Sequence, residues 1–593
     1  RIHNIEGKLT ITNIEILLQN SYQATHQQGE MRAVQSIKTN PYLFAYAKKL
    51  SKTKTKIGPL LNENNQYTAS SYEMSNIFKT QYDSVFSDPM SSSVYSEGAK
   101  LTEEYLIDLE FTPTDFQKAI DELSNNSSSG PDGVPAFLLK KCKTELSGPL
   151  SMLWRTLLDA GITPSILKLA HIIPIHKGDH RGLAENYRPI ALTSHIIKLF
   201  EKVLRNKIVQ YLEENNLLNN SQHGFRQGRS CLSQLLAHYD KIVSLMEKGL
   251  NVDTVYLDFS KAFDKVDHLI VIEKLSLLGI GGKILKWIKS FLLNRRQCVI
   301  VNGFSSEPSH VRSGVSQGSV IGPLLFLILI GDIDAELYNS FLSSFADDTR
   351  ASKGVESLRD ISLLQTDLDV IYQWALNNNM TFNSKKLELL RYGNNSSLKA
   401  ETSYLSPDGT QIPEKAHVKD LGVMMSNTGT FSEHINTVCQ KARDMCSWIL
   451  RTFRSRSPEV MKTLWKSLVL HILDYCSQLW CPIRAGLIQQ LEEIQQSFTR
   501  KIRLDEQPDY WERLNLLKMY SLQRRRERYR IIYVWKILEQ QVPNISCEGN
   551  SGIQKLHLET TRNGRTCQIP PQNLVVFMSQ YVRKQCRFEI TDS

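Results

Sequence analysis

Two short acidic segments place the strongest constraint on what this chain can fold into. The first, VYLDFSKAFD, carries Asp258, and the second, FADDT, carries Asp347 and Asp348. Apolar and polar residues alternate up to Asp258, and this period of two predicts a half-buried strand from which the carboxylate projects. Neighbouring side chains of a strand point to opposite faces, so Asp347 and Asp348 can share one site only at a tight turn. The second segment therefore predicts a strand-turn-strand hairpin with acids at its tip.

Carboxylates that share one folded site favour a bound cation. They repel one another and resist desolvation unless a cation neutralises them, and an oxygen-only ligand set suits Mg²⁺ or Mn²⁺ better than zinc. Such ions serve phosphoryl transfer, in which one ion lowers the pKa of an attacking hydroxyl and another holds the leaving pyrophosphate. The alternative is a solvated turn, because turns favour aspartate.

Five segments of the chain resemble, in order and spacing, the motifs of reverse transcriptases. The segments VYLDFSKAFDKVDH (255–268), SGVSQGSVIGPLLFLILIGD (313–332) and FADDT (345–349) are similar to the first, second and third palm motifs. Upstream, NYRPIAL (186–192) and QHGFRQGRSCLSQLL (222–236) resemble the fingers motifs of non-LTR, LINE-type retrotransposons.

The resemblance continues on both sides of these motifs. The segment GPDGVPAFLLKKC from Gly130 is similar to the pre-polymerase region, and FNSKKLELLRYG from Phe382 is similar to the rest of the palm. The segment LWKSLVLHILDYCSQLWCP from Leu464 resembles the thumb side of the jockey and chicken-repeat-like groups. The resemblance implies an RNA-directed DNA polymerase, a nucleotidyltransferase, with an α+β right-hand fold: fingers, a palm of antiparallel sheet and helices, and a helical thumb.

The resemblance also implies a metal site and a sugar gate. Asp258, Asp347 and Asp348 match the carboxylates that hold Mg²⁺, or Mn²⁺, and the backbone carbonyl of Phe259 is a further ligand. Phe263 lies five positions after Asp258, where reverse transcriptases place a bulky side chain under the sugar. An aromatic ring there would collide with a ribose 2′-OH, which favours DNA synthesis. The alternative is a phenylalanine of the core.

Other motif positions match residues that bind the incoming nucleotide. Lys177 and Arg188 match the fingers residues that clasp the triphosphate, where a point charge and a planar fork both suit phosphate oxygens. The alternative for Arg188 is a structural salt bridge. Gln317 and Gly318 lie in the SQGS turn, where glycine permits close backbone approach and the amide can reach the nucleotide or the template. Lys386 matches the palm lysine proposed to protonate pyrophosphate, although Lys385 stands beside it.

Two arginines of the GFRQGRS segment, Arg226 and Arg229, keep two interpretations open. They either meet template phosphates or anchor the fingers. Farther along the chain, a second arginine-rich stretch from Arg524 to Arg530 predicts either a surface that follows duplex phosphates or a solvated helix face.

Composition is consistent with a large enzyme that holds a polyanion. The chain has 593 residues, 41% of them hydrophobic, and a formal charge of +10, so it can bury large cores and attract nucleic acid. Ten cysteines without a C-x-x-C pair support neither a disulfide framework nor a zinc site. We expect a polar, basic N-terminal arm (1–105), a pre-polymerase extension (106–157), fingers and palm (158–426), and a helical basic thumb with the C-terminal region (427–593).

The resemblance implies partners and a place of action. These are an RNA template, a DNA primer or target, and dNTPs, in a ribonucleoprotein of the cytoplasm and nucleus that performs target-primed reverse transcription. The longest apolar run is far too short to span a membrane. The chain opens within family-like sequence, which predicts a fragment without the N-terminal endonuclease. Two rivals are a group II intron maturase and a catalytically dead, domesticated copy that only binds RNA.

Overall fold

The structure, a computed structural model, describes residues 57–90, 101–393, 402–504 and 508–542. It has two compact units. The larger unit comprises Lys56–Ser230 and Lys248–Lys415, and the smaller one includes Cys231–Glu247 and the chain from Ala416 onward. Helices and sheets are mixed throughout, which confirms the α+β class. The division differs from the expected ranges, because the helix Cys231–Glu247 leaves the middle of the 158–426 range and joins the smaller unit.

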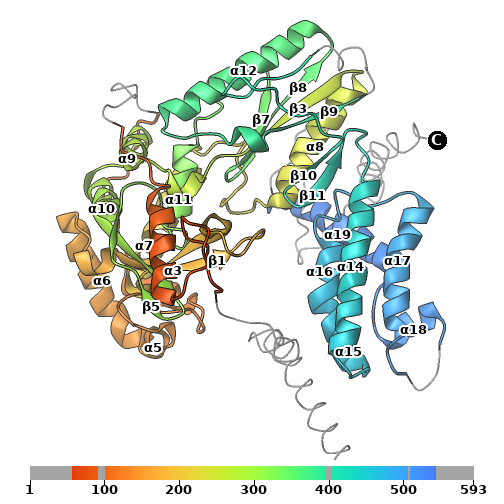
Figure 1. The fold of residues 1–593 in the computed structure, drawn as a ribbon, viewed down its shortest axis with the longest axis horizontal. Coiled ribbons are helices and arrows are strands. Elements are labelled where there is room, and N and C mark those ends of the chain that lie inside the picture. The colour runs from red at the N-terminus through yellow and green to blue at the C-terminus, as the bar shows by residue number, and fades with distance from the viewer. Residues whose placement is uncertain (1–56, 91–100, 394–401, 505–507, 543–593) are drawn as a thin grey trace, which may run out of the picture. The chain divides into compact units, whose positions relative to one another are not determined.

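The larger unit contains a four-stranded antiparallel sheet, which lies under helix α12 (Leu358–Asn377) in Figure 1. Its strands run in the order β7, β8, β3, β9. Their bounds are Phe341–Phe345 for β7, Asp348–Val355 for β8, Asn251–Leu257 for β3 and Glu388–Tyr392 for β9. Strand β3 is more deeply buried than the expected half-buried strand, because it lies between two neighbours and most of its side chains are covered. The sheet brings segments that are far apart in the sequence to one end.

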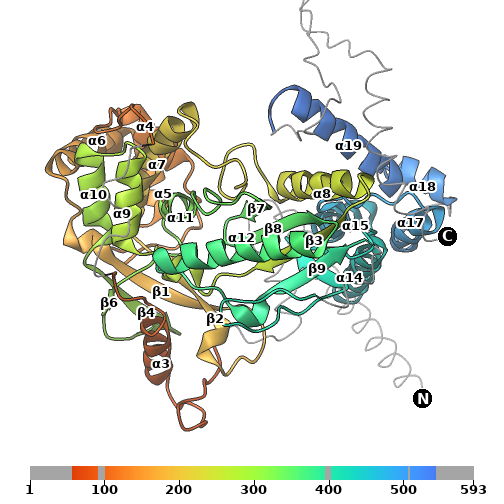
Figure 2. The ribbon, with the colours of Figure 1, turned by 90° about the horizontal axis from the view of Figure 1, so that it is seen from above.

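Helix α12 lies along this sheet beside β8 (Figure 2). A capping box of Ser357 and Asp360 starts the helix, which satisfies backbone N–H groups that would otherwise lack partners. Its buried stripe contains Leu364, Leu368 and Ile371. The helical period of the sequence predicts this stripe, and the structure confirms it.

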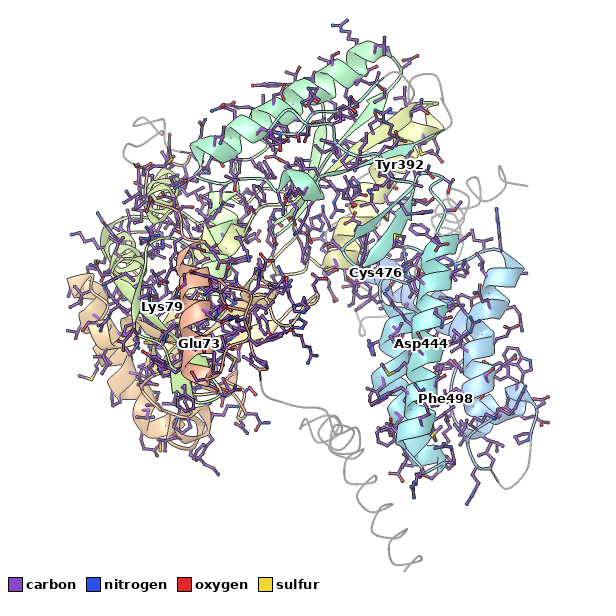
Figure 3. All side chains as sticks on the ribbon, viewed as in Figure 1. Glu73, Lys79, Tyr392, Asp444, Cys476 and Phe498 are labelled. Atoms are coloured by element: carbon purple, nitrogen blue, oxygen red, sulfur yellow. The ribbon has the colours of Figure 1, made fainter. Side chains whose placement is uncertain are left out.

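The larger unit also contains a second sheet, in which β1 (Leu169–His176) is paired with two other strands. Strand β1 pairs antiparallel with β2 (Tyr187–Leu192) and parallel with β4 (Arg295–Val301), and the short strands β5 (Phe304–Ser305) and β6 (Ser309–Val311) also pair with β4. Helix α3 (Ser71–Asp83) packs against β4. Figure 3 labels Glu73 and Lys79 on this helix. Phe78 of α3 is fully buried, and its ring lies 5.0 Å from that of Tyr187.

Within the polar, basic N-terminal arm predicted over residues 1–105, the described residues 57–90 pack against the second sheet. The apolar side chains of α3 complete the core of the second sheet, with Leu60, Met74, Phe78 and Tyr82 packed among residues of β1, β2 and β4. Only short helical patterns mark this region in the sequence, because one face of a short helix supplies few apolar positions. Residues 1–56 lie outside the described part of the chain.

The remaining helices of the larger unit surround one aromatic cluster. They are α4 (Pro113–Asp121), α5 (Ala136–Lys141), α6 (Lys143–Ala160), α7 (His195–Glu214), α9 (His268–Leu277), α10 (Gly282–Leu292) and α11 (Gly322–Leu329). Trp154 stacks on Phe200 with ring centroids 4.5 Å apart, and Trp287 meets both rings edge-on. All three side chains are fully buried.

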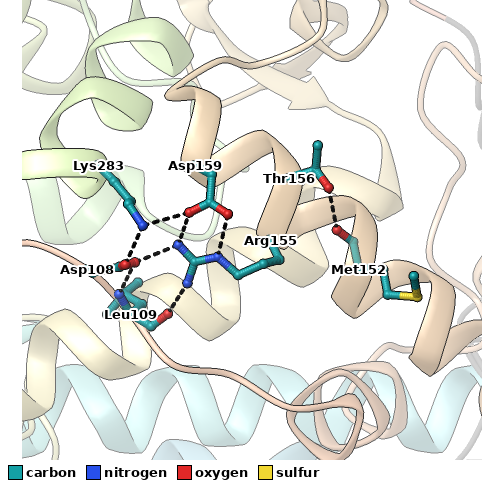
Figure 4. Close-up of polar contacts among 7 residues, drawn as sticks. All are labelled: Asp108, Leu109, Met152, Arg155, Thr156, Asp159 and Lys283. Carbon is teal, nitrogen blue, oxygen red and sulfur yellow. Dashed lines mark hydrogen bonds and ion pairs between the residues drawn. The ribbon is translucent and has the colours of Figure 1, made fainter.

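An exposed ion cluster ties the strand-like segment before α4 to two of these helices (Figure 4). Arg155 of α6 pairs with Asp108 and with Asp159, and Lys283 of α10 bridges the same two carboxylates at 2.7 Å. The hydrogen bond from Arg155 is the largest influence that holds the pKa of Asp159 at about 2. The backbone of Leu106 also pairs with the loop at Gly279, so the expected boundary between residues 105 and 106 falls inside a docked segment.

The smaller unit is mostly helical and has one short hairpin. It contains α8 (Cys231–Glu247), β10 (His417–Asp420), β11 (Val423–Ser426), α14 (Ser432–Thr452), α15 (Pro458–Leu464), a π-helical turn (Trp465–Val469), α16 (Leu470–Asp474), α17 (Ala485–Thr499), α18 (Tyr510–Leu516) and α19 (Leu522–Leu538). Figure 3 labels Asp444 on α14, Phe498 on α17 and Cys476 after α16. Phe498 packs against Trp465, and Cys439 and Cys446 lie on the buried face of α14.

The arginine-rich helix α19 presents only part of its charge to solvent. Arg525 pairs with Asp474 at 2.9 Å, and Arg526 is buried. Arg524 and Arg528 are exposed, and both lie over the ring of Tyr520. The stretch is therefore not a wholly solvated face, and contact of the exposed Arg524 and Arg528 with duplex phosphates stays a prediction. Among the described helices, none is long and apolar enough to cross a membrane.

Candidate active site

The three aspartates lie at one end of the four-stranded sheet. Strands β7 and β8 form a hairpin in which Phe345 pairs with Asp348, so Ala346 and Asp347 make a two-residue turn. Asp258 directly follows β3, whose last residue, Leu257, pairs with Thr349 of β8. The structure thus confirms the predicted hairpin with acids at its tip. It also places Asp258 beside that tip, although 89 residues separate it from Asp347 in the sequence.

The electrostatics of this end of the sheet favour added positive charge. Burial raises the pKa of Asp347, and the nearby carboxylate of Asp258 raises it further. Burial likewise raises the pKa of Asp348, with Asp347 as the next cause. Lys386, which lies in a 3₁₀ turn, donates a hydrogen bond from Nζ to Asp258 Oδ2 at 2.9 Å. Of the two neighbouring lysines, Lys386 is thus the one that reaches the acids.

The donor set fits a hard divalent cation. Carboxylate oxygens are the preferred ligands of Mg²⁺ and Mn²⁺, and a cation would offset both the burial and the repulsion that raise the pKa values of Asp347 and Asp348. Over the described ranges, no group of three or more His, Cys, Asp and Glu side chains is already spaced to hold a metal ion. Asp258 instead forms an ion pair with Lys386, and binding of a metal ion by Asp258 would break this ion pair.

The peptide after Asp258 is fixed by backbone contacts. Asn383 N–H donates to Asp258 O, and Ser260 N–H donates to Thr381 O, both at 2.8 Å. The ring of Phe259 is buried and stacks on Phe382 at 4.4 Å. Together these contacts set the direction of the Asp258 side chain and of the Phe259 carbonyl.

Phe263 lies on a wall of aromatic rings rather than deep in the core. Its ring stacks on Phe326 at 4.6 Å and meets Phe225 edge-on at 6.1 Å. The side chain is only partly buried, so part of the ring remains accessible. This combination of support and exposure suits a steric gate.

The SQGS turn is held tightly against β2. Ala191 N–H donates to Gln317 O at 2.9 Å, and Gln317 Nε2 donates to Asp264 Oδ1 at 3.1 Å. Gly318 has φ +137°, and a Cβ there would lie 2.4 Å from Ala191 O. Only glycine tolerates both the backbone conformation and the close approach.

Lys177 and Arg188 stand on the exposed side of the second sheet. Arg188 of β2 pairs across from Ile175 of β1, and its charge acts to lower the pKa of Asp347. Lys177 follows β1, and its backbone N–H donates to Asn186 O. Both side chains are exposed, and no ion pair of Arg188 occurs among the described residues, which disfavours the structural salt bridge.

Arg226 and Arg229 both bind neighbouring parts of the chain. Arg226 forms a two-pronged pair with Glu213, with distances of 3.1 Å and 2.7 Å, and donates to Asn219 O at 2.7 Å. Arg229 donates to the backbone and side-chain oxygens of Asn220. Burial is the main cause that lowers the pKa of Arg229 to about 10. Of the two interpretations left open by the sequence, the structure favours anchoring.

Replacing Arg226 by alanine should therefore destabilise the fold by about 2 kcal/mol, because it breaks a pair whose arginine is 6% exposed. Urea unfolding measures this change. The matched control is Arg312→Ala, which removes an exposed pair with Asp88 and should cost less than about 1 kcal/mol. Equal stabilities of Arg226→Ala and wild type, with weaker RNA binding, would favour a template contact instead.

Asp264 is a site residue that sequence reasoning missed. Burial raises the pKa of its carboxyl, which accepts the hydrogen bond from Gln317. Its backbone oxygen accepts a hydrogen bond from Ser313 Oγ, which in turn accepts the N–H of Ser87. The segment after α3 is thereby linked to the SQGS turn. In the sequence, Asp264 is marked only as an acidic residue directly after Phe263. The periodicity of the segment does not indicate that its carboxylate binds Gln317.

Comparison with known proteins finds a match over this part of the chain. Residues 175–425 match the family described as reverse transcriptase (RNA-dependent DNA polymerase). The probable RNA-directed DNA polymerase from transposon X-element of Drosophila melanogaster is 27% identical over 66% of this chain and 44% of its own length. The RNA-directed DNA polymerase from mobile element jockey, from the same organism, is 27% identical over 60% of this chain and 39% of its own length.

A further relative matches a shorter part of the chain. The retrovirus-related Pol polyprotein from type-1 retrotransposable element R2 of Popillia japonica is 27% identical over 45% of this chain and 45% of its own length. The chain thus spans less than half the length of each of these relatives. The matches confirm the resemblance to non-LTR retrotransposon reverse transcriptases that the motifs indicate.

Proposed function

We propose that this chain, whose reverse transcriptase domain covers residues 175–425, synthesises DNA on an RNA template by extending a 3′-OH primer. One observation carries the proposal: Asp258, Asp347 and Asp348 lie at the same end of an antiparallel sheet, where burial and the neighbouring carboxylates raise the pKa of the last two. Carboxylates in such an arrangement favour a bound divalent cation, and nucleotidyl transfer requires such cations.

The architecture supports a right-hand assignment. We assign the sheet β7-β8-β3-β9 with α12 to the palm, and the second sheet with α7 to the fingers. The helical part of the smaller unit corresponds to the thumb. The segment 57–90 belongs with the fingers, because its apolar residues complete the core of the second sheet.

The residues of the site would hold the metal ions and supply a proton. Bound to Asp258, Asp347, Asp348 and the Phe259 carbonyl, two Mg²⁺ or Mn²⁺ ions would lower the pKa of the primer hydroxyl and stabilise the pyrophosphate. Lys386, released from Asp258, has an ammonium that can donate a proton to pyrophosphate.

The triphosphate and the sugar have separate contacts. Arg188 and Lys177 offer exposed positive charge to the triphosphate. Gln317 and Gly318 present a fixed backbone against which the nucleotide can lie, and Phe263 supports the sugar. Arg188 thus serves two purposes, since its charge also acts on Asp347.

Replacing Phe263 by valine should weaken the discrimination between dNTPs and rNTPs on the order of tenfold to a hundredfold, because truncation opens space for the 2′-OH. The measurement is the ratio of kcat/KM for dTTP and UTP on one primer-template. The ratio is taken within one enzyme, so it does not depend on the fraction of active protein. Unchanged selectivity in an active variant would mean that another residue excludes the ribose.

The same chemistry defines the partners. The template is RNA, the primer is a DNA 3′-OH and the substrates are dNTPs. In target-primed reverse transcription the primer would be a nicked chromosomal strand, which places the ribonucleoprotein in the nucleus as well as the cytoplasm. The test is extension of a DNA primer on a heteropolymeric RNA with Mg²⁺, with an omitted-metal control containing EDTA. Extension on DNA templates alone would contradict the proposal.

A further inference from the structure

The turn that carries Asp347 is held in a conformation that its own sequence does not favour. Ala346, the residue before Asp347, has φ +55°. This is the left-handed region, in which the Cβ of an L-residue crowds the following carbonyl oxygen. Ala346 is buried. Some other part of the protein must therefore keep this peptide in place.

Gln222 supplies the missing support through three hydrogen bonds. Its Oε1 accepts the N–H of Ala346 at 2.8 Å, and its Nε2 donates to Ala346 O at 3.1 Å. The same Oε1 accepts the N–H of Gly224 at 2.7 Å. The partners fix the orientation of the amide, because two N–H groups face one atom and a carbonyl faces the other. The side chain of Gln222 thus satisfies both backbone groups of Ala346.

The backbone around Gln222 extends this support. Gln222 pairs with Ser344 of β7 in a parallel bridge, where His223 N–H donates to Ser344 O at 2.9 Å and Ser344 N–H donates to Ser221 O at 3.0 Å. Gly224 approaches so closely that a Cβ on it would lie 2.3 Å from Ala346 N. Arg229 in turn holds the segment, since it donates to Gln222 O at 3.1 Å. The QHGF segment therefore forms a cradle for the FADD turn.

We propose that Gln222 is a positioning residue, which sets the direction of Asp347 by clamping the Ala346 peptide. This inference rests on the proposed function, because it assigns Asp347 to the metal site. Gln222 is 6% exposed and acts through the backbone of Ala346. The clamp joins the QHGF segment to the FADD turn, although Gln222 and Ala346 are 124 residues apart in the sequence.

The first test is Gln222→Met, which keeps the length of the side chain and removes all three hydrogen bonds. A displacement of Asp347 by about 1 Å should lower kcat for primer extension on the order of tenfold to a hundredfold, with little change in KM for the dNTP. If Gln222 acted only through packing, Gln222→Met would not lower kcat while leaving KM for the dNTP unchanged. The matched control is Gln210→Met, because Gln210 is an exposed amide on α7 that bonds only to Glu214 in the described chain. It should leave kcat unchanged.

A second measurement does not depend on activity. Amide hydrogen exchange in peptides covering β7 and the turn should be faster in Gln222→Met than in wild type, while exchange in α12 stays the same. Gln222→Glu keeps an acceptor for both N–H groups, but its second carboxylate oxygen, when ionised, faces Ala346 O and repels it, so exchange at the turn should again be faster than in wild type. If Gln222→Met does not fold, the exchange measurement is made on Gln222→Glu alone.

A double variant separates the clamp from other effects. Glycine adopts the left-handed conformation readily, so Gln222→Met should cost less kcat in an Ala346→Gly background than in wild type. Wild-type kcat and unchanged exchange at the turn in Gln222→Met would overturn the inference. An inactive wild-type protein would instead contradict the proposed function, while the exchange measurement would still decide whether the clamp exists.

Discussion

Replacement of Asp347 by asparagine is expected to lower primer extension about a thousandfold, because a lost metal ligand removes about 4 kcal/mol of transition-state stabilisation. Asp258→Asn should have an effect of the same size. Binding of an RNA-DNA hybrid should stay nearly intact, since the lost charge acts on the ions and its removal does not add repulsion toward phosphates. Single-turnover extension and fluorescence anisotropy measure the two quantities separately.

The control for this prediction is Asp369→Asn. Asp369 is an exposed residue of α12 in the same unit, and its carboxylate accepts a hydrogen bond only from Gln365 among the described residues. Extension by this variant should equal that of wild type. Wild-type extension by Asp347→Asn or Asp258→Asn would show that the metal site lies elsewhere.

Replacement of Phe78 by alanine should destabilise the larger unit by about 3 to 5 kcal/mol, because it removes a fully buried ring from the core of the second sheet. This is a large fraction of the stability of a typical domain. Urea unfolding, followed by tryptophan fluorescence, measures the loss. The prediction tests whether the segment 57–90 is an integral part of the fold.

Tyr72→Ala is the matched control on the same helix. Tyr72 is 48% exposed, so its removal should change the free energy of unfolding by less than about 1 kcal/mol. If Phe78→Ala were as stable as Tyr72→Ala, the segment 57–90 would not contribute to the stability of the larger unit.

Features with a local cause could be predicted from the sequence. Two adjacent aspartates require a turn if they share a site, and the hairpin follows from that requirement. The buried stripes of α12 and α14 follow from the helical period of their apolar residues. The family motifs add the meeting of Asp258 with Asp347, which strand periodicity alone does not supply.

Features that depend on contacts between distant segments could not be predicted. The polar sequence around α3 shows little sign that Phe78 fills a core built by β1, β2 and β4. The pairing of Arg226 with Glu213 is equally invisible, because an arginine has the same local pattern whether it meets a carboxylate or a phosphate. The choice between Lys385 and Lys386 depends on the 3₁₀ turn that directs Lys386 toward Asp258.

The most direct measurement is extension of a 5′-labelled DNA primer annealed to a heteropolymeric RNA, with the four dNTPs and Mg²⁺. Wild type and Asp258→Asn should be purified in parallel and shown to be equally folded by circular dichroism. Wild type should produce template-directed, full-length DNA, and the variant should produce none above background. The proposed function is contradicted if folded wild-type protein leaves the primer unextended in both Mg²⁺ and Mn²⁺, or if the variant extends it equally well.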